Sequence, residues 1–164
     1  MAKARRGGSK RDRAKLESSL SQVDADLLIG MEKICLEPYQ VVHFKPGMGV
    51  EIDFVNDTEK ERFRLIIERS EINTRHAKYE LLARHSIPLL RLEIAGATHY
   101  NPDGTEVPCP HLHIYRPGFR DRYAKPMPHE FGDPDDPLEC LRAFLGYCNA
   151  VQVPRISQKR GLFP

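Results

Sequence analysis

Residues 62–69, with the sequence RFRLIIER, decide the fold class because apolar and charged side chains alternate along them. The apolar positions Phe63, Leu65 and Ile67 share one face of an extended strand, and charged residues dominate the other face. A strand of this kind is typical of an antiparallel sheet that is covered on one side and solvated on the other. The stretch therefore predicts a half-solvated antiparallel sheet.

Similar short runs lie on both sides of this strand, and turn-forming residues separate them. These runs are residues 39–45, 49–55, 75–84, 88–95 and 106–115. Asn56-Asp57 and the NPDG sequence at residues 101–104 are strong turn signals. Short connections favour antiparallel neighbours, so the runs extend the same sheet.

Two helical patterns flank the strands in the sequence. In the first, apolar residues recur at three- and four-residue steps from Leu16 to Ile34, with Ser21 as the expected N-cap. The second is expected to begin after Asp136 and to run to about Cys148. The sequence thus predicts an α+β fold, in which a curved antiparallel sheet of about five to seven strands has an N-terminal and a C-terminal helix packed on one face.

A chain of 164 residues suits a single domain. Residues 1–15 differ from the rest because they are basic and have no apolar face. Their cations include Arg5, Arg6, Lys10, Arg11 and Arg13. We expect a disordered basic arm over residues 1–15 and one α+β domain over residues 16–164, with the arm serving either to hold nucleic-acid phosphates or to solubilise the chain.

Several functional classes are excluded by what the sequence lacks. No apolar run is long enough to span a membrane, and no secretory signal begins the chain, so we expect a cytoplasmic protein with no membrane partner. The four cysteines form no CxxC pair, which favours buried thiols over zinc ligands. P-loop, dinucleotide-binding and HExxH motifs are also missing. We therefore expect no cofactor.

The sequence HLHIY at residues 111–115 is the best candidate for a functional site. Strand alternation places His111, His113 and Tyr115 on one face and the two aliphatic residues toward the core. His99, which precedes the NPDG turn, could approach the pair across that turn. On this pattern the two histidines should lie on the polar, solvated face of the sheet.

Three interpretations of these histidines remain open. They could bind a metal ion, although no second ligand pair of fixed spacing accompanies them, and we expect no metal. They could act as acid and base on an RNA phosphodiester, with an arginine stabilising the charged phosphorane. They could also form an ordinary polar sheet face. The catalytic candidates are His111, His113, His99 and Arg91. The candidates for substrate binding are Tyr115, Arg116, Arg120, Arg122 and Tyr123.

Several short motifs occur in a fixed order along the chain. They are RLEI at 91–94, His99, NPDG at 101–104, HLHIY at 111–115, AKP at 124–126 and YCN at 147–149. This order resembles an uncharacterised family of small bacterial proteins carried on mobile elements and prophages, where toxins are frequent. The resemblance transfers no catalytic residue, but it favours a nucleic-acid-directed role. We therefore expect a small RNA-acting protein, such as a metal-independent endoribonuclease of toxin type. The alternative is a non-catalytic module that binds nucleic acid or a protein partner such as an antitoxin-like protein.

Overall fold

The computed structural model describes residues 20–158, so the predicted basic arm at residues 1–15 lies outside the described residues. The described part has one large open sheet in the strand order β10-β9-β6-β5-β4-β3-β1-β11. All neighbours in it are antiparallel except β1 and β11. Its strands are β1 (Lys33–Cys35), β3 (Gly49–Val55), β4 (Arg62–Arg69), β5 (Ala77–Ala83), β6 (Ile87–Ile94), β9 (His111–Ile114), β10 (Ala124–Pro126) and β11 (Ala150–Gln152).

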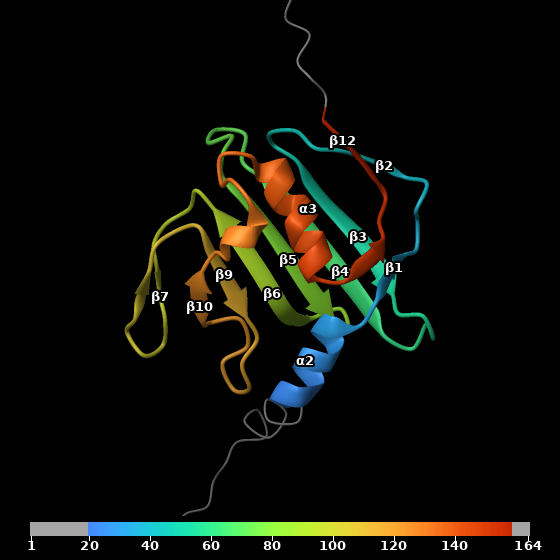
Figure 1. The fold of residues 1–164 in the computed structure, drawn as a ribbon, viewed down its shortest axis with the longest axis horizontal. Coiled ribbons are helices and arrows are strands. Elements are labelled where there is room, and N and C mark those ends of the chain that lie inside the picture. The colour runs from blue at the N-terminus through green and yellow to red at the C-terminus, as the bar shows by residue number, and fades with distance from the viewer. Residues whose placement is uncertain (1–19, 159–164) are drawn as a thin grey trace, which may run out of the picture.

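Two small sheets and three helical segments complete the fold (Figure 1). The small sheets pair β2 (Val41–His43) with β12 (Arg155–Ser157), and β7 (His99–Tyr100) with β8 (Glu106–Val107). The helical segments are α2 (Gln22–Gly30), the 3-10 turn η1 (His129–Phe131) and α3 (Pro137–Tyr147). Among residues 20–158, no helix is long and apolar enough to cross a membrane.

The predicted α+β class with a mostly antiparallel sheet and two helices is confirmed, and β3 and β4 have the predicted bounds. Other details differ. The large sheet has eight strands and is not closed. The single strand expected over residues 106–115 is divided into β8 and β9, which belong to different sheets. The segment between β9 and α3 contributes β10 and η1.

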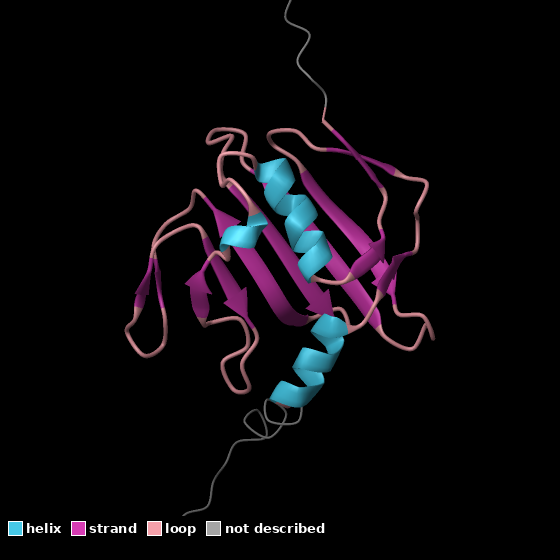
Figure 2. Ribbon diagram, in the orientation of Figure 1, coloured by secondary structure: helices cyan, strands magenta, loops and turns pink. Residues whose placement is uncertain are grey.

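The core lies between the large sheet and α3, which crosses one face of it (Figures 1 and 2). Phe63, Leu65 and Ile67 on β4 are buried there, as the alternation predicts. The Tyr79 hydroxyl donates a 2.6 Å hydrogen bond to the Pro137 carbonyl at the first residue of α3. The helix therefore covers one face of the sheet and leaves the charged face of β4 uncovered by either helix.

Both helices begin at the N-cap residues that the sequence predicts, but α2 buries a different face from the predicted one. Ser21 accepts a hydrogen bond from the Asp24 amide at 3.1 Å, as an N-cap does. In α2, however, Ala25 and Leu28 are buried, whereas Leu27, part of the predicted apolar stripe, is 58% exposed. The helical pattern in the sequence continues to Ile34, but α2 ends at Gly30 because the chain then forms β1, which pairs with β3 and β11.

A fully buried lysine, Lys33, joins the ends of the two helices. Helices leave their last carbonyl groups without partners inside the helix. The three N–H groups of the Lys33 ammonium are shared among four carbonyl oxygens at 2.7–3.0 Å, those of Leu28, Ile29, Met31 and Cys148. Burial lowers the pKa of Lys33 to about 8, so most of the lysine is protonated at neutral pH. The ammonium thus supplies donors to the C-termini of both α2 and α3.

Candidate functional site

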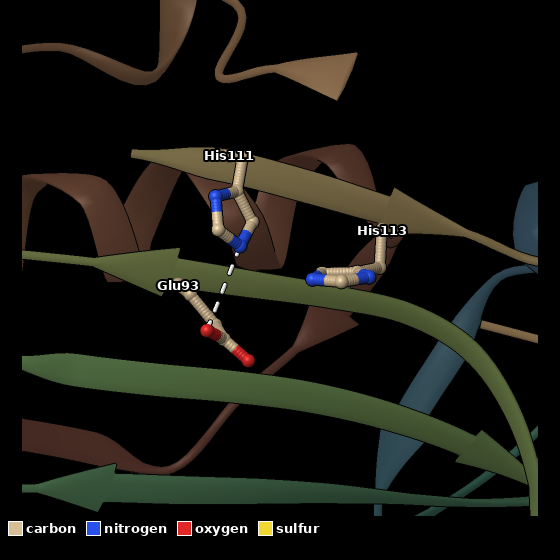
Figure 3. A group of neighbouring side chains, drawn as sticks. All are labelled: Glu93, His111 and His113. Carbon is tan, nitrogen blue, oxygen red and sulfur yellow. Dashed lines mark ion pairs between the residues drawn. The ribbon is translucent and has the colours of Figure 1, made fainter. Parts of the chain in front are cut away.

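The pairing of β6 with β9 places four functional side chains on one face of the sheet. In this register Arg91 lies opposite His113, and Glu93 lies opposite His111. Directly opposite residues of an antiparallel pair point to the same side. The expectation that His111 and His113 share a face is confirmed, and the two imidazoles and the Glu93 carboxylate converge on one space (Figure 3).

His99 joins this group from β7. Its ring centroid is 4.5 Å from that of His113 and 5.7 Å from that of His111. The centroids of His111 and His113 are themselves 4.9 Å apart. The three rings therefore form one contact cluster, which we call the histidine cluster. The sequence left open whether His99 reaches the pair, and the structure places it in contact with both rings.

The prediction that this face is solvated at the histidines is wrong, because His111 is 1% exposed and His113 is 0% exposed. The segment after β9 folds back over them. His113 Nδ1 donates to the Asp121 carbonyl at 2.8 Å, and His99 Nε2 donates to the Arg122 carbonyl at 2.9 Å. Of the three rings, only that of His99 is partly exposed.

Hydrogen bonding sets the tautomer of His113, and burial sets its protonation state. Since Nδ1 donates to a carbonyl, the Nε2 atom of the neutral ring keeps a free lone pair. Burial, followed by the nearby Arg91 cation, lowers the pKa of His113 to about 4. His113 is therefore neutral at pH 7 and is available as a proton acceptor or a metal ligand.

His111 is in an unusual environment because neither of its ring nitrogens has a hydrogen-bond partner among the described residues. Its Nε2 is 3.5 Å from Glu93 Oε2, which is too long for a well-formed hydrogen bond. The proximity of the His111 ring nitrogen and the Arg91 cation lowers the pKa of Glu93, against the opposing effect of burial. Buried polar atoms without partners are rare in proteins and need an explanation.

Arg91 forms ion pairs with two carboxylates next to the histidine cluster. Its Nη1 is 2.7 Å from Asp121 Oδ2, and its Nε is 3.1 Å from Glu93 Oε1. Its Nη2 is 3.3 Å from Nδ1 and 3.2 Å from Nε2 of His113. A nitrogen nearly equidistant from both ring nitrogens lies over the ring and along neither lone pair. The guanidinium is thus engaged by two carboxylates, and its Nη2 atom lies against the His113 ring.

Residues 116–125, which we call the arginine–aromatic loop, carry most of the predicted substrate-binding residues. The side chains of Arg116, Arg120 and Arg122 are exposed, and Tyr123 is half-buried. The Arg116 guanidinium lies 4.0 Å from the centroid of the Tyr123 ring, and Phe119 contacts the same ring at 5.1 Å. The structure therefore brings these predicted residues together beside the histidine cluster.

A family model matches residues 20–150, and it describes a family of unknown function, DUF6978. The chain belongs to this family. No curated protein and no solved structure matches the chain. Membership in DUF6978 covers the whole sheet apart from the end of β11 and includes every residue of the histidine cluster. No function is known for this family, so any chemistry of the chain rests on the geometry of the site itself.

One predicted binding residue of this DUF6978 member, Tyr115, is not at the site. It is 1% exposed and belongs to the hydrophobic core, where its hydroxyl donates to the Leu20 carbonyl at 3.0 Å. Strand β9 ends at Ile114, so the alternation that assigned Tyr115 to the histidine face no longer holds there. Its burial leaves no ring face on which a base could stack.

Sequence reasoning also missed residues that the structure places at the site. Asp121 holds Arg91 through its side chain and His113 through its carbonyl. Phe119 and Lys125 extend the exposed aromatic and basic surface of the loop. The sequence signal that could have found them is the dense mixture of arginine and aromatic residues between Arg116 and Lys125.

Proposed function

We propose that the protein binds single-stranded RNA through the arginine–aromatic loop. Four exposed cations lie on it or at its end: Arg116, Arg120, Arg122 and Lys125. The one acid in the loop, Asp121, is already paired with Arg91. The loop therefore presents an excess of positive charge to solvent.

The aromatic residues of the loop favour single-stranded RNA over a duplex. Unstacked bases bind proteins by stacking on aromatic rings and arginine planes, while cations hold the phosphates. Phe119 is 40% exposed, and Tyr123 contacts both Phe119 and the Arg116 guanidinium. A base could stack beside this assembly and leave its phosphates near the surrounding arginines.

The observation that carries the proposal is the direct backbone connection between this surface and the histidine cluster. The carbonyls of Asp121 and Arg122, which lie in the loop, accept the hydrogen bonds of His113 and His99. An RNA strand on the loop would therefore lie next to the cluster.

Replacing Arg116, Arg122 and Lys125 together with alanine should weaken binding of a single-stranded RNA oligonucleotide by about tenfold or more and flatten its salt dependence. Each lost phosphate contact reduces the log–log salt slope by about 0.7, so three contacts should remove about two units. The measurement is fluorescence anisotropy over a series of salt concentrations.

The matched control is the triple alanine variant of Arg62, Arg142 and Arg155. These three arginines are exposed, and the variant removes the same charge outside the loop. It should bind within about twofold of the wild type, since salt screens distant charges. Equal weakening in both triples would show non-specific attraction and refute the assignment to the loop.

A second candidate function is cleavage of the bound strand, and contact among the three imidazoles favours it. Because His111 and His113 are buried, only His99 is placed to touch a substrate. Its Nε2 donates to the Arg122 carbonyl, so Nδ1 has the lone pair that would accept the 2′-hydroxyl proton. The 2′ oxygen would then bond to phosphorus, and the 5′ oxygen would leave with a proton from an imidazolium or water. This gives a cyclic phosphate and a 5′-hydroxyl end.

If this cleavage occurs without metal, the wild-type protein should cut single-stranded RNA in excess EDTA. The His99→Gln variant should lose about a hundredfold or more of that rate, within the usual contribution of acid–base catalysis. His129→Gln is the control, because its side chain is fully exposed. Absence of cleavage by the wild type with RNA binding retained would make the protein a binding module.

The association with mobile elements, toxins and an antitoxin-like partner stays a prediction.

A further inference from the structure

We propose that Glu93, His111 and His113 bind a divalent transition-metal ion, with His99 at the side of the site that faces solvent. This inference uses the same histidine cluster as the proposed function but does not depend on RNA binding. It replaces our expectation of a site without metal.

The distances between the ligand atoms suit such an ion. One ligand atom from each of Glu93, His111 and His113 can be chosen so that all lie within 4.8 Å of one another. Bonds of about 2.0–2.2 Å place the ligand atoms of a tetrahedral site roughly 3.4 Å apart. Small side-chain rotations would close that difference, because all three groups already point into the same space (Figure 3).

The strongest observation is the lack of partners at His111. Its ring is 1% exposed, and both of its nitrogens are without hydrogen bonds among the described residues. Leaving a buried polar atom unpaired costs about 1–3 kcal/mol. A metal bond to Nε2, which already faces Glu93 Oε2, would satisfy this atom and give the buried imidazole a role.

His113 has the hydrogen-bond pattern of a metal-binding histidine. Metal ligands of this type usually donate their other ring N–H to a carbonyl or carboxylate, which fixes the tautomer and the ring orientation. His113 Nδ1 donates to the Asp121 carbonyl at 2.8 Å and leaves Nε2 free. The Arg91 guanidinium lies over the ring face, so it does not block that lone pair.

The local charge also permits a cation. Arg91 is balanced by Asp121 and by Oε1 of Glu93, while Oε2 of Glu93 faces His111. With neutral imidazoles, these three charged groups sum to one negative charge. Imidazole ligands favour ions such as Zn²⁺, Co²⁺, Ni²⁺ or Fe²⁺ over Mg²⁺ and Ca²⁺, which prefer oxygen. Two imidazoles and one carboxylate leave coordination positions open for water or a substrate.

The test is a titration of the full chain, first stripped of metal, with Zn²⁺ and with Co²⁺ in the absence of RNA. Isothermal titration and equilibrium dialysis should find one Zn²⁺ per chain, and Co²⁺ should produce visible ligand-field absorption bands. Glu93→Gln keeps the shape of the side chain and removes its charge, and His111→Leu removes a ligand. Each should weaken Zn²⁺ binding by about a hundredfold.

The control variants are His43→Gln and His129→Gln, whose side chains are exposed and lie outside the cluster. They should bind Zn²⁺ as the wild type does, and circular dichroism should show that every variant is folded. Less than about one tenth of an equivalent in the wild type, or equal weakening in the control variants, would overturn the proposal. Because RNA is absent, failure of RNA binding by the loop would leave this result unchanged.

Discussion

Replacing Lys33 with methionine should lower the free energy of unfolding by about 3–5 kcal/mol. The side chain is 0% exposed, and its three N–H groups are shared among four carbonyl oxygens at the ends of α2 and α3. Methionine has a similar length but no N–H donor, so buried acceptors would lose their partners. Each such loss costs about 1–3 kcal/mol, although relaxation and entering water recover part of it.

Urea unfolding at pH 7, followed by circular dichroism, measures this loss. Lys60→Met is the matched control, since Lys60 is exposed and the chemical change is the same. The control should change stability by no more than about 0.5 kcal/mol. A loss below about 1 kcal/mol for Lys33→Met would show that the helix ends do not depend on this ammonium.

The strands that the sequence predicted well are those whose pattern is local. β3 and β4 are long enough to show alternation, and they are adjacent in the chain and paired in the sheet. The three-residue strands β1 and β11 are too short to show a period, and their parallel pairing joins residues far apart in the sequence. The role of Lys33 depends on that long-range pairing, so no local pattern could indicate that a lysine is buried there.

At the candidate site, too, local features could be predicted from the sequence and long-range features could not. Alternation correctly placed His111 and His113 on one face, because it depends only on strand geometry. Their burial was missed, because it depends on the later segment that folds back over the sheet. That segment contacts the histidine cluster through the carbonyls of Asp121 and Arg122. The same folding back explains why polar histidines occupy positions with almost no solvent contact.

His111→Leu and His113→Leu should change stability in opposite directions when the protein is free of metal. The two histidines are neighbours on β9 and are buried to the same extent. His111 has two unpaired nitrogens among the described residues, so leucine of similar volume removes a desolvation penalty. We expect the free energy of unfolding to rise by about 1–2 kcal/mol.

His113, in contrast, donates to the Asp121 carbonyl and contacts the Arg91 guanidinium. Leucine there would leave that carbonyl without its partner and loosen the loop above it, which should lower the free energy of unfolding by about 1–3 kcal/mol. Urea unfolding in excess EDTA measures both changes. If both variants are destabilised, a partner satisfies His111 even without metal, for example ordered water. His111→Leu could be more stable than the wild type in EDTA and also fail to gain stability when Zn²⁺ is added. That result would show that the imidazole serves metal binding and lowers the stability of the metal-free protein.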